Sequence, residues 1–200
     1  MQTERVAYMS NRTVLSNEQQ EYPRRLLAES VSKFHINAPT ADIDITDWLF
    51  NLDELEYINS TPVSRAHLSA GLTHAPDGKR MSINIEDVGG ALTVEHYNEV
   101  ISEKLHCRVQ SISDLLIGRE YTTVHVIWEL LANRTEGNHH EFVNNVWVHT
   151  TPQYDAYLDS HRIPYEVARH GFQLALDAHN AEETPYFAAS IENKALRKNK

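Results

Sequence analysis

The sequence is poor in cysteine and has no long apolar run, and each shortage excludes a class of protein. Its single cysteine, Cys107, excludes an intramolecular disulfide and is typical of a reducing compartment. No run reaches the roughly 20 apolar residues that span a bilayer. The first residues also lack the basic region and apolar segment of a secretory signal peptide. We therefore expect a cytoplasmic protein without a membrane span.

Basic residues are also scarce, and this argues against a polyanionic partner. Lysine and arginine total 18 against 28 aspartates and glutamates, which gives a formal net charge of -10. Such a protein repels nucleic acids and anionic membranes unless a basic patch intervenes. The one basic cluster, Arg197, Lys198 and Lys200, lies at the end of the chain and is typical of a solvated tail. We expect no nucleic-acid partner.

What the sequence does have is enough apolar material for one folded domain. Hydrophobic residues make up 41% of the 200 positions and charged residues 23%, as in ordinary globular proteins. A chain of this length can bury a continuous core without disulfides or metals. No internal repeat or low-complexity linker divides it, so one domain is the expectation.

The pattern along the chain predicts an α+β fold with a curved antiparallel sheet and helical ends. Short polar connections between successive strands imply antiparallel pairing, because parallel neighbours need long crossovers. Thr151 before Pro152 is a good helix start, and Pro164 and Pro185 are expected to divide the helical end into three pieces. The expected helices are 18–28, one or two within 43–55, a short piece after 151, 165–183 and a last segment from 185. The expected strands are 30–36, 62–73, 80–88, 91–101, 105–112, 121–131 and 140–149.

One stretch of sequence and the order of the elements carry a resemblance to a known superfamily. A strand ending in Asn37-Ala38-Pro39, a helix pair containing Asp47-Trp48-Leu49-Phe50, an antiparallel meander and a helical C-terminus together resemble the START and Bet v 1-like helix-grip superfamily. The similarity covers about residues 30 to 183 and includes no catalytic motif, so it is an analogy of fold.

The resemblance implies a sheet wrapped around a long C-terminal helix, with a cavity between them for a lipid, sterol, polyketide or aromatic compound. Polyketide cyclases and zinc-dependent hydrolases of acylated phloroglucinols share this scaffold. Residues 1–29 would then be an N-terminal extension with a short helix, 30–183 the ligand-binding domain and 184–200 a helical C-terminal extension. The extensions could cap the cavity or form a homodimer contact.

Three residues on the predicted strands are candidates for acid/base catalysis on a bound carbonyl compound. His96 shares a face with Leu92 and Val94, which predicts that it points toward the concave side of the sheet. His125 and Glu129 share one face of strand 121–131. If the opposite, apolar face lines the cavity, His125 and Glu129 point to solvent, where such residues stabilise a half-exposed sheet.

Aromatic residues offer a second kind of site, because they commonly line small-molecule cavities. Aromatic side chains on adjacent strands beneath a helix are also typical of a packed core, and that alternative stays open. The candidates for ligand binding are Trp128, Trp147, Tyr97, Phe142 and Phe172.

His179 and Glu183 are spaced i, i+4 on the predicted C-terminal helix, which places both side chains within reach of one metal ion. The pair resembles half of the zinc site of the phloroglucinol hydrolases, whose other ligands come from the sheet. Glu129, Glu95, His96 or His67 would complete it. The competing interpretation is a pair of surface residues near a chain end.

The preferred hypothesis is a protein that binds a small apolar, aromatic or polyketide-like molecule in an internal cavity, with acid/base catalysis and no cofactor. The first alternative is a zinc-dependent C–C bond hydrolase that uses His179 and Glu183. The second is a non-catalytic interaction protein that dimerises through its extra termini.

Overall fold

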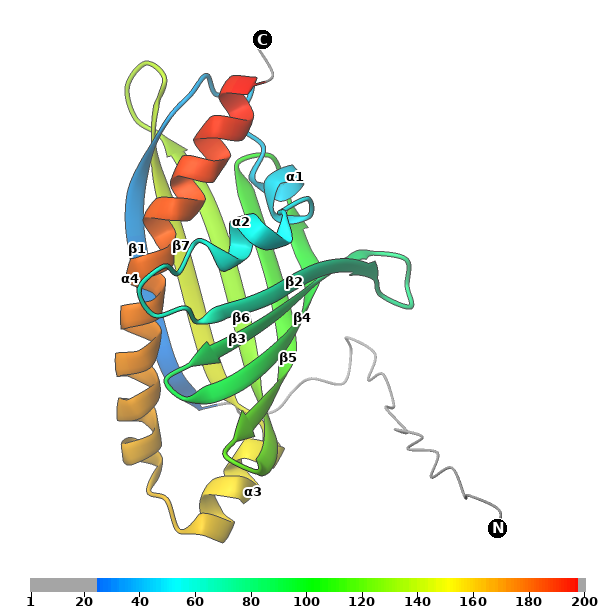
Figure 1. Cartoon of the computed structure of the whole chain (residues 1–200), viewed down its shortest axis with the longest axis vertical. Coiled ribbons are helices and arrows are strands. Elements are labelled where there is room, and N and C mark those ends of the chain that lie inside the picture. Colours follow the sequence, from blue (N-terminus) through cyan, green and yellow to red (C-terminus); the bar gives the residue numbers. More distant parts are fainter. Residues whose placement is uncertain (1–24, 198–200) are drawn as a thin grey trace.

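The computed structural model describes residues 25–197, which form one antiparallel sheet curved around a long C-terminal helix (Figure 1). The strand order is β1-β7-β6-β5-β4-β3-β2, so β2 to β7 form a meander and β1 pairs with the last strand. The strands are β1 (Leu26–Asn37), β2 (His67–His74), β3 (Arg80–Val88), β4 (Ala91–Ser102), β5 (His106–Ile117), β6 (Glu120–Arg134) and β7 (His139–Thr150). The helices are α1 (Ile45–Leu49), α2 (Glu54–Ile58), α3 (Pro152–His161) and α4 (Tyr165–Arg197).

Local capping chemistry sets where the shorter helices begin. The side chains of Asp44 and Asp53 accept hydrogen bonds from backbone N–H groups in the first turns of α1 and α2. Thr151 does the same for α3, with Pro152 in the first turn as the sequence predicts. Helices α1 and α2 lie across one end of the sheet and α3 lies at the other (Figure 1).

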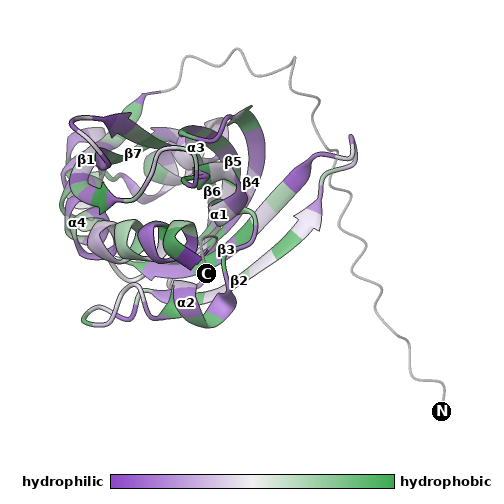
Figure 2. Cartoon of the chain, turned by 90° about the horizontal axis from the view of Figure 1, so that it is seen from above, coloured by the Kyte–Doolittle hydropathy of each residue, from purple (hydrophilic) through white to green (hydrophobic). Residues whose placement is uncertain are grey.

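Helix α4 lies on the concave side of the sheet, as the view from above shows (Figure 2). It contacts β1 along its length and reaches α1 near its C-terminal end. None of the helices in the described part of the chain is both long enough and apolar enough to cross a membrane. The predicted α+β class, the meander and the long C-terminal helix are therefore confirmed.

Three predicted boundaries are wrong. The strand predicted from residue 62 begins only at His67, because the backbone N–H groups of Val63 and Ser64 donate to Glu182 on α4 instead of to a neighbouring strand. Residues 26–28, assigned to an N-terminal helix, open strand β1, where pairing with β7 outweighs local helix preference; the rest of that predicted helix lies outside the described residues. Pro185 lies inside α4 instead of dividing it. Proline removes one helical hydrogen bond, but Thr184 and Phe187 on either side are buried and hold the helix against the sheet.

The space between sheet and helix is filled at one end only. Near α1, the indole of Trp48 packs edge-on against Phe187 with 5.1 Å between ring centroids. The buried side chains of Phe142 and Ile191 belong to the same core. Toward α3, the helix instead presents small residues to the sheet, and a cavity remains.

Candidate metal and substrate site

A cavity of about 350 Å³ lies between the concave face of the sheet and α4, toward the α3 end. The β3–β4 turn closes one side: Gly89 has φ +64°, and a Cβ there would lie 2.9 Å from the Cβ of Ala175. Only glycine allows this close approach of the turn to the helix. The walls near α3 are aliphatic and aromatic, including Val124, Val126, Val146, Val148, Ile163 and Tyr154.

The opposite end of the cavity is polar, because β3 and β4 turn their polar faces inward. Asn84, Glu86 and Glu95 line the cavity and are buried, whereas Ile83 and Ile85 lie on the other face of β3. This inverts the usual arrangement, in which a strand buries its apolar side. Buried polar side chains carry a desolvation cost, so their concentration here marks a site.

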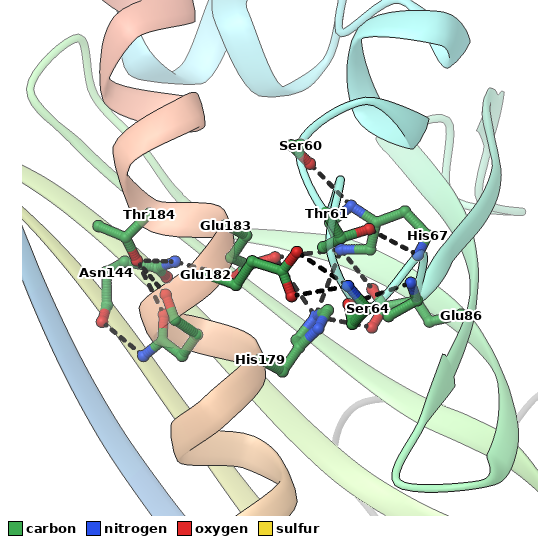
Figure 3. A network of polar contacts seen from close by, with 12 residues as sticks. Ser60, Thr61, Ser64, His67, Glu86, Asn144, His179, Glu182, Glu183 and Thr184 are labelled. Atoms are coloured by element: carbon green, nitrogen blue, oxygen red, sulfur yellow. Dashed lines mark hydrogen bonds and ion pairs between the residues drawn. The ribbon is translucent and has the colours of Figure 1, made fainter.

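Four polar side chains, of which Glu86 is one, converge at this end of the cavity (Figure 3). The Nε2 atom of His67 lies 3.3 Å from Nε2 of His179 and 3.1 Å from Oε2 of Glu183. His179 Nε2 lies 3.4 Å from the same Glu183 oxygen and 3.2 Å from Oε2 of Glu86. Sheet and helix thus contribute two side chains each.

His67 is held rigidly, and its neighbours select its tautomer. Its ring stacks on Tyr57 with 3.8 Å between centroids and faces Phe187 on the other side. Its Nδ1 lies 2.9 Å from the carbonyl oxygen of Tyr57, which can only accept, so Nδ1 carries the proton and donates. In the neutral ring, Nε2 then presents a lone pair to the cluster.

The preceding loop places His67 beside α4. The carboxylate of Glu182 accepts hydrogen bonds from the backbone N–H groups of Val63, at 2.7 Å, and Ser64, at 3.1 Å. The backbone N–H of His67 donates to the hydroxyl of Thr61. These bonds attach the start of β2 to the same helical turn that carries Glu183.

Asn144 on β7 orients Glu183. Its Nδ2 donates to Oε1 of Glu183 at 2.9 Å, which leaves Oε2 to face the two histidines. Its Oδ1 accepts from the indole N–H of Trp128 at 2.7 Å, and Nδ2 also contacts the hydroxyl of Thr184. Each side-chain group of Asn144 is therefore used, and the amide has one orientation.

Tyr57 supports the carboxylate of Glu86 on the sheet. Tyr57 donates a short hydrogen bond to Oε1 of Glu86. Burial and then the charges of Glu86 and Glu95 raise the pKa of Tyr57 well above its usual value, so it stays a donor. Burial and the charge of Glu86 likewise raise the pKa of Glu95, and Glu95 Oε2 has no hydrogen-bond partner among the described residues. Glu95 lines the cavity beside Glu86.

Burial opposes charge on the four converging residues, but they stabilise one another. Burial lowers the pKa of His67 and His179, yet the facing Glu183 and Glu86 outweigh it and raise both values. Burial raises the pKa of Glu86 and Glu183, yet the facing imidazoles outweigh it and lower both. The facing imidazoles and carboxylates therefore favour one another's charged forms.

The donor set fits a zinc ion. Zinc takes imidazole nitrogen and carboxylate oxygen at about 2.0 to 2.2 Å, and in a tetrahedron this separates neighbouring ligand atoms by about 3.3 to 3.6 Å. The separations among His67, His179 and Glu183 are 3.1 to 3.4 Å. Those three form the one group of potential metal ligands found in residues 25–197, and Glu86 lies beside this group, with its Oε2 3.2 Å from Nε2 of His179.

Three of the five aromatic residues predicted to bind ligand, Tyr97, Trp128 and Phe172, line the cavity. The other two do not. Phe142 is fully buried in the core at the α1 end. Trp147 lies on the convex face, where its indole N–H donates to Glu29. These two predictions are corrected.

The three predicted acid/base residues lie outside the cavity. The pleat that points Glu95 and Tyr97 inward turns His96 outward, where its Nε2 lies 3.2 Å from Asp114. The predicted orientation of His96 is wrong, because the polar face of β4 is the concave one.

His125 and Glu129 are on the convex face of β6, opposite the Val124, Val126 and Trp128 face that lines the cavity. This is the arrangement expected if the apolar face lines the cavity. Glu129 there pairs with His106 at 2.8 Å and with Arg108 at 2.6 Å. The geometry gives these residues no contact with a bound molecule.

The predicted metal pair, His179 and Glu183, lines the cavity. Two of the residues predicted to complete the metal site also lie there: His67 contacts the pair, and Glu95 lines the cavity. Sequence reasoning missed Glu86, Tyr57 and Asn144. A signal for Glu86 was present: Ser82, Asn84 and Glu86 alternate with apolar residues, and a buried strand can turn either face inward.

The comparisons with known proteins concern structure. Neither a protein-family model nor a curated protein sequence matches the chain. The Zhui aromatase/cyclase from Streptomyces sp. R1128 matches with a TM-score of 0.57 and 14% identity over 86% of this chain and 95% of that one. The chain has the START and Bet v 1-like helix-grip fold.

Two further helix-grip structures are similar. The di-domain aromatase/cyclase StfQ from the steffimycin pathway matches with a TM-score of 0.52 and 12% identity, over 84% of this chain and 52% of that chain. A START superfamily protein from Mycobacterium smegmatis matches with a TM-score of 0.43 and 11% identity, over 85% and 98%. At these identities the likeness establishes the fold alone.

Proposed function

We propose that the protein is a zinc-dependent hydrolase that cleaves a bond next to the carbonyl of a small, largely apolar aromatic or polyketide-like compound. The observation that carries the proposal is the convergence of His67, His179, Glu183 and Glu86 at the polar end of an otherwise apolar cavity. The resemblance to the phloroglucinol hydrolases makes a C–C bond between a ring and an acyl carbon the leading target.

Each residue at the polar end has a part in this proposal. His67, His179 and Glu183 would hold the ion, with Glu86 beside His179, and the ion would supply Lewis acidity for the carbonyl and for an attacking water. Tyr57 and Asn144 fix the positions of the carboxylates. The aliphatic walls exclude bulk water and strengthen electrostatic interactions within the site.

The reaction balances without any oxidant or reductant. Water adds its hydroxyl to the carbonyl carbon, the bond to the ring carbon breaks, and the ring carbon keeps the electron pair and takes a proton. The products are a carboxylic acid and the deacylated ring. Glu95 lines the same end of the cavity and is placed to supply the proton through Oε2.

Elemental analysis of the purified full chain tests the proposal. We expect about one zinc per chain, and loss of zinc from His179→Ala and Glu183→Gln. His170→Ala, an exposed position on the same helix, is the control and keeps its zinc. The wild-type protein should release a carboxylic acid from an acylated trihydroxybenzene, detected by mass spectrometry, and the two ligand variants should not.

A metal-free second candidate is an aromatase/cyclase-like activity, which the structural match to the Zhui aromatase/cyclase favours. It would use the cavity and Glu95 without an ion. Wild-type protein that contains no zinc after purification and after incubation with zinc, yet binds aromatic ketones, would overturn the hydrolase proposal and support this one.

A further inference from the structure

The lining of the cavity extends over more than four turns of α4. Its lining residues on α4 run from Val167 to Glu183, 16 positions, and at 1.5 Å per residue this is about 24 Å of helix, whereas a sphere of 350 Å³ would be only about 9 Å across. On β7, the lining runs from Val146 to Val148, beyond the Asn144 that anchors Glu183. A compact ring bound at the polar end would leave the space beside Gly171 empty.

The two ends of the cavity differ in polarity and in exposure. Glu86, Glu95 and Glu183 are buried and line the inner end of the cavity, and Glu95 Oε2 has no hydrogen-bond partner among the described residues. At the outer end, Val167 is 62% exposed. Gly171 is also exposed there, so the cavity opens beside the N-terminal half of α4.

Small residues on α4 create the space in the outer half. Ala168, Gly171 and Ala175 are spaced three and four apart, so they lie on one face of the helix, and all three line the cavity. A Cβ added at Gly171 would meet no atom within 4 Å. Across the space stand Val126 and Val148, which offer only carbon to a ligand.

We infer that the substrate has two parts, a carbonyl-bearing head that enters first and lies at the His67–Glu183 end, and an unbranched apolar tail that lies between Gly171 and the valines of β6 and β7. The inference rests on the proposed function for the chemistry of the head. The tail follows from the shape and lining of the cavity alone. Ala168, Gly171 and Ala175 are then the residues that set the accepted tail length.

Binding of a homologous series of linear phenyl ketones to the zinc-loaded full chain tests the inference. Trp128 lines the cavity, so quenching of its fluorescence reports occupancy. Each added methylene of the ketone that contacts the apolar wall should tighten binding roughly fourfold. The gain should stop once the alkyl chain reaches the mouth of the cavity. Affinity that does not change with chain length would overturn the inference.

Gly171→Leu locates the tail. It should weaken binding of the long ketones about tenfold or more and leave the shortest, acetophenone, within about twofold. His170→Leu adds the same side chain at the neighbouring exposed position and should change neither. Equal weakening of all ketones by Gly171→Leu would overturn the placement of the tail.

The outcomes separate this inference from the proposed function. A length-dependent affinity in a protein without zinc or hydrolysis would remove the hydrolase and keep the tail. Zinc and hydrolysis with no dependence on chain length would keep the hydrolase and remove the tail.

Discussion

The two halves of helix α4 face the same curved sheet but fill the space beside it differently. The C-terminal half carries Phe187 and Ile191, which pack against Trp48 in a solid core. The N-terminal half carries Ala168, Gly171 and Ala175, and a cavity remains. The four converging donors lie at the junction of the two halves. Side-chain size along one helix therefore divides the molecule into a part that stabilises and a part that binds.

The largest expected effect comes from removing a large side chain from the core beside the C-terminal half of α4. Phe187→Ala removes a ring that contacts Trp48, Trp128 and His67, and we expect a loss of about 3 to 5 kcal/mol in the free energy of unfolding. Phe172→Ala in the hollow half is the matched control and should cost about 1 to 2 kcal/mol, because that ring is partly exposed. Denaturant titration measures both, and equal costs would break the contrast.

The next largest effect concerns zinc affinity at the site where the two halves of α4 meet. Asn144→Ala frees Oε1 of Glu183, and we expect zinc affinity to fall about 10- to 100-fold, as for other residues that orient metal ligands. Asn145→Ala, the next residue on the opposite face of β7, should leave zinc affinity unchanged. Competition with a chromophoric chelator measures the affinity. A variant that loses stability but keeps its zinc affinity would reduce Asn144 to a structural role.

A third comparison is with the cluster of Glu129, His106 and Arg108 on the convex face, which also joins a carboxylate to basic side chains. Burial raises the pKa of Glu129, but the hydrogen bonds from His106 and Arg108 outweigh it and lower the pKa. The stabilisation is thus present above the ordinary glutamate pKa and is lost as pH falls through the lower folded value. Glu129→Gln should cost about 1 kcal/mol at neutral pH, since Arg108 is partly solvated.

Unfolding measured at neutral and at acidic pH checks this prediction. The difference between Glu129→Gln and wild type should shrink toward zero in acid, where wild-type Glu129 is also uncharged. Zinc content and ketone binding should be the same in both proteins at neutral pH. A loss of binding in this variant would place function on the convex face and contradict the account.

The smallest expected effect compares two glycines on the cavity wall. Gly171→Ala adds a methyl group that meets no atom within 4 Å, and it should stabilise the helix by about 0.5 to 1 kcal/mol. Gly89→Ala should instead destabilise, because of its positive φ and the 2.9 Å approach to Ala175. Thermal unfolding of the two variants should move in opposite directions, and a shift of both in the same direction would contradict the packing described for the turn.

The sequence predicts the order of the elements well because strand alternation, turn residues and helix caps are local signals. Asp77-Gly78 between β2 and β3 and Thr151-Pro152 before α3 are examples, and the structure confirms both boundaries. The i, i+4 spacing of His179 and Glu183 likewise identifies one side of the site. Nothing local places these residues opposite the sheet.

It is harder to predict which face of each strand points inward, because a polar side chain usually indicates exposure to solvent. On β4, Glu95 and Tyr97 are buried in the cavity and His96 is turned outward. On β2, the pairing with β3 shifts between His67 and Ser69, and Leu68 is 47% exposed while His67 is buried. A site that needs buried polar groups reverses the rule that sequence patterns rely on.

The most direct test of the central claim is a crystal structure of the zinc-loaded protein with anomalous data at the zinc absorption edge. The account predicts one strong anomalous peak within bonding distance of Nε2 of His67, Nε2 of His179 and the Glu183 carboxylate, at the inner end of the cavity. Anomalous density elsewhere, or these three side chains packed together with no peak among them at saturating zinc, would contradict it.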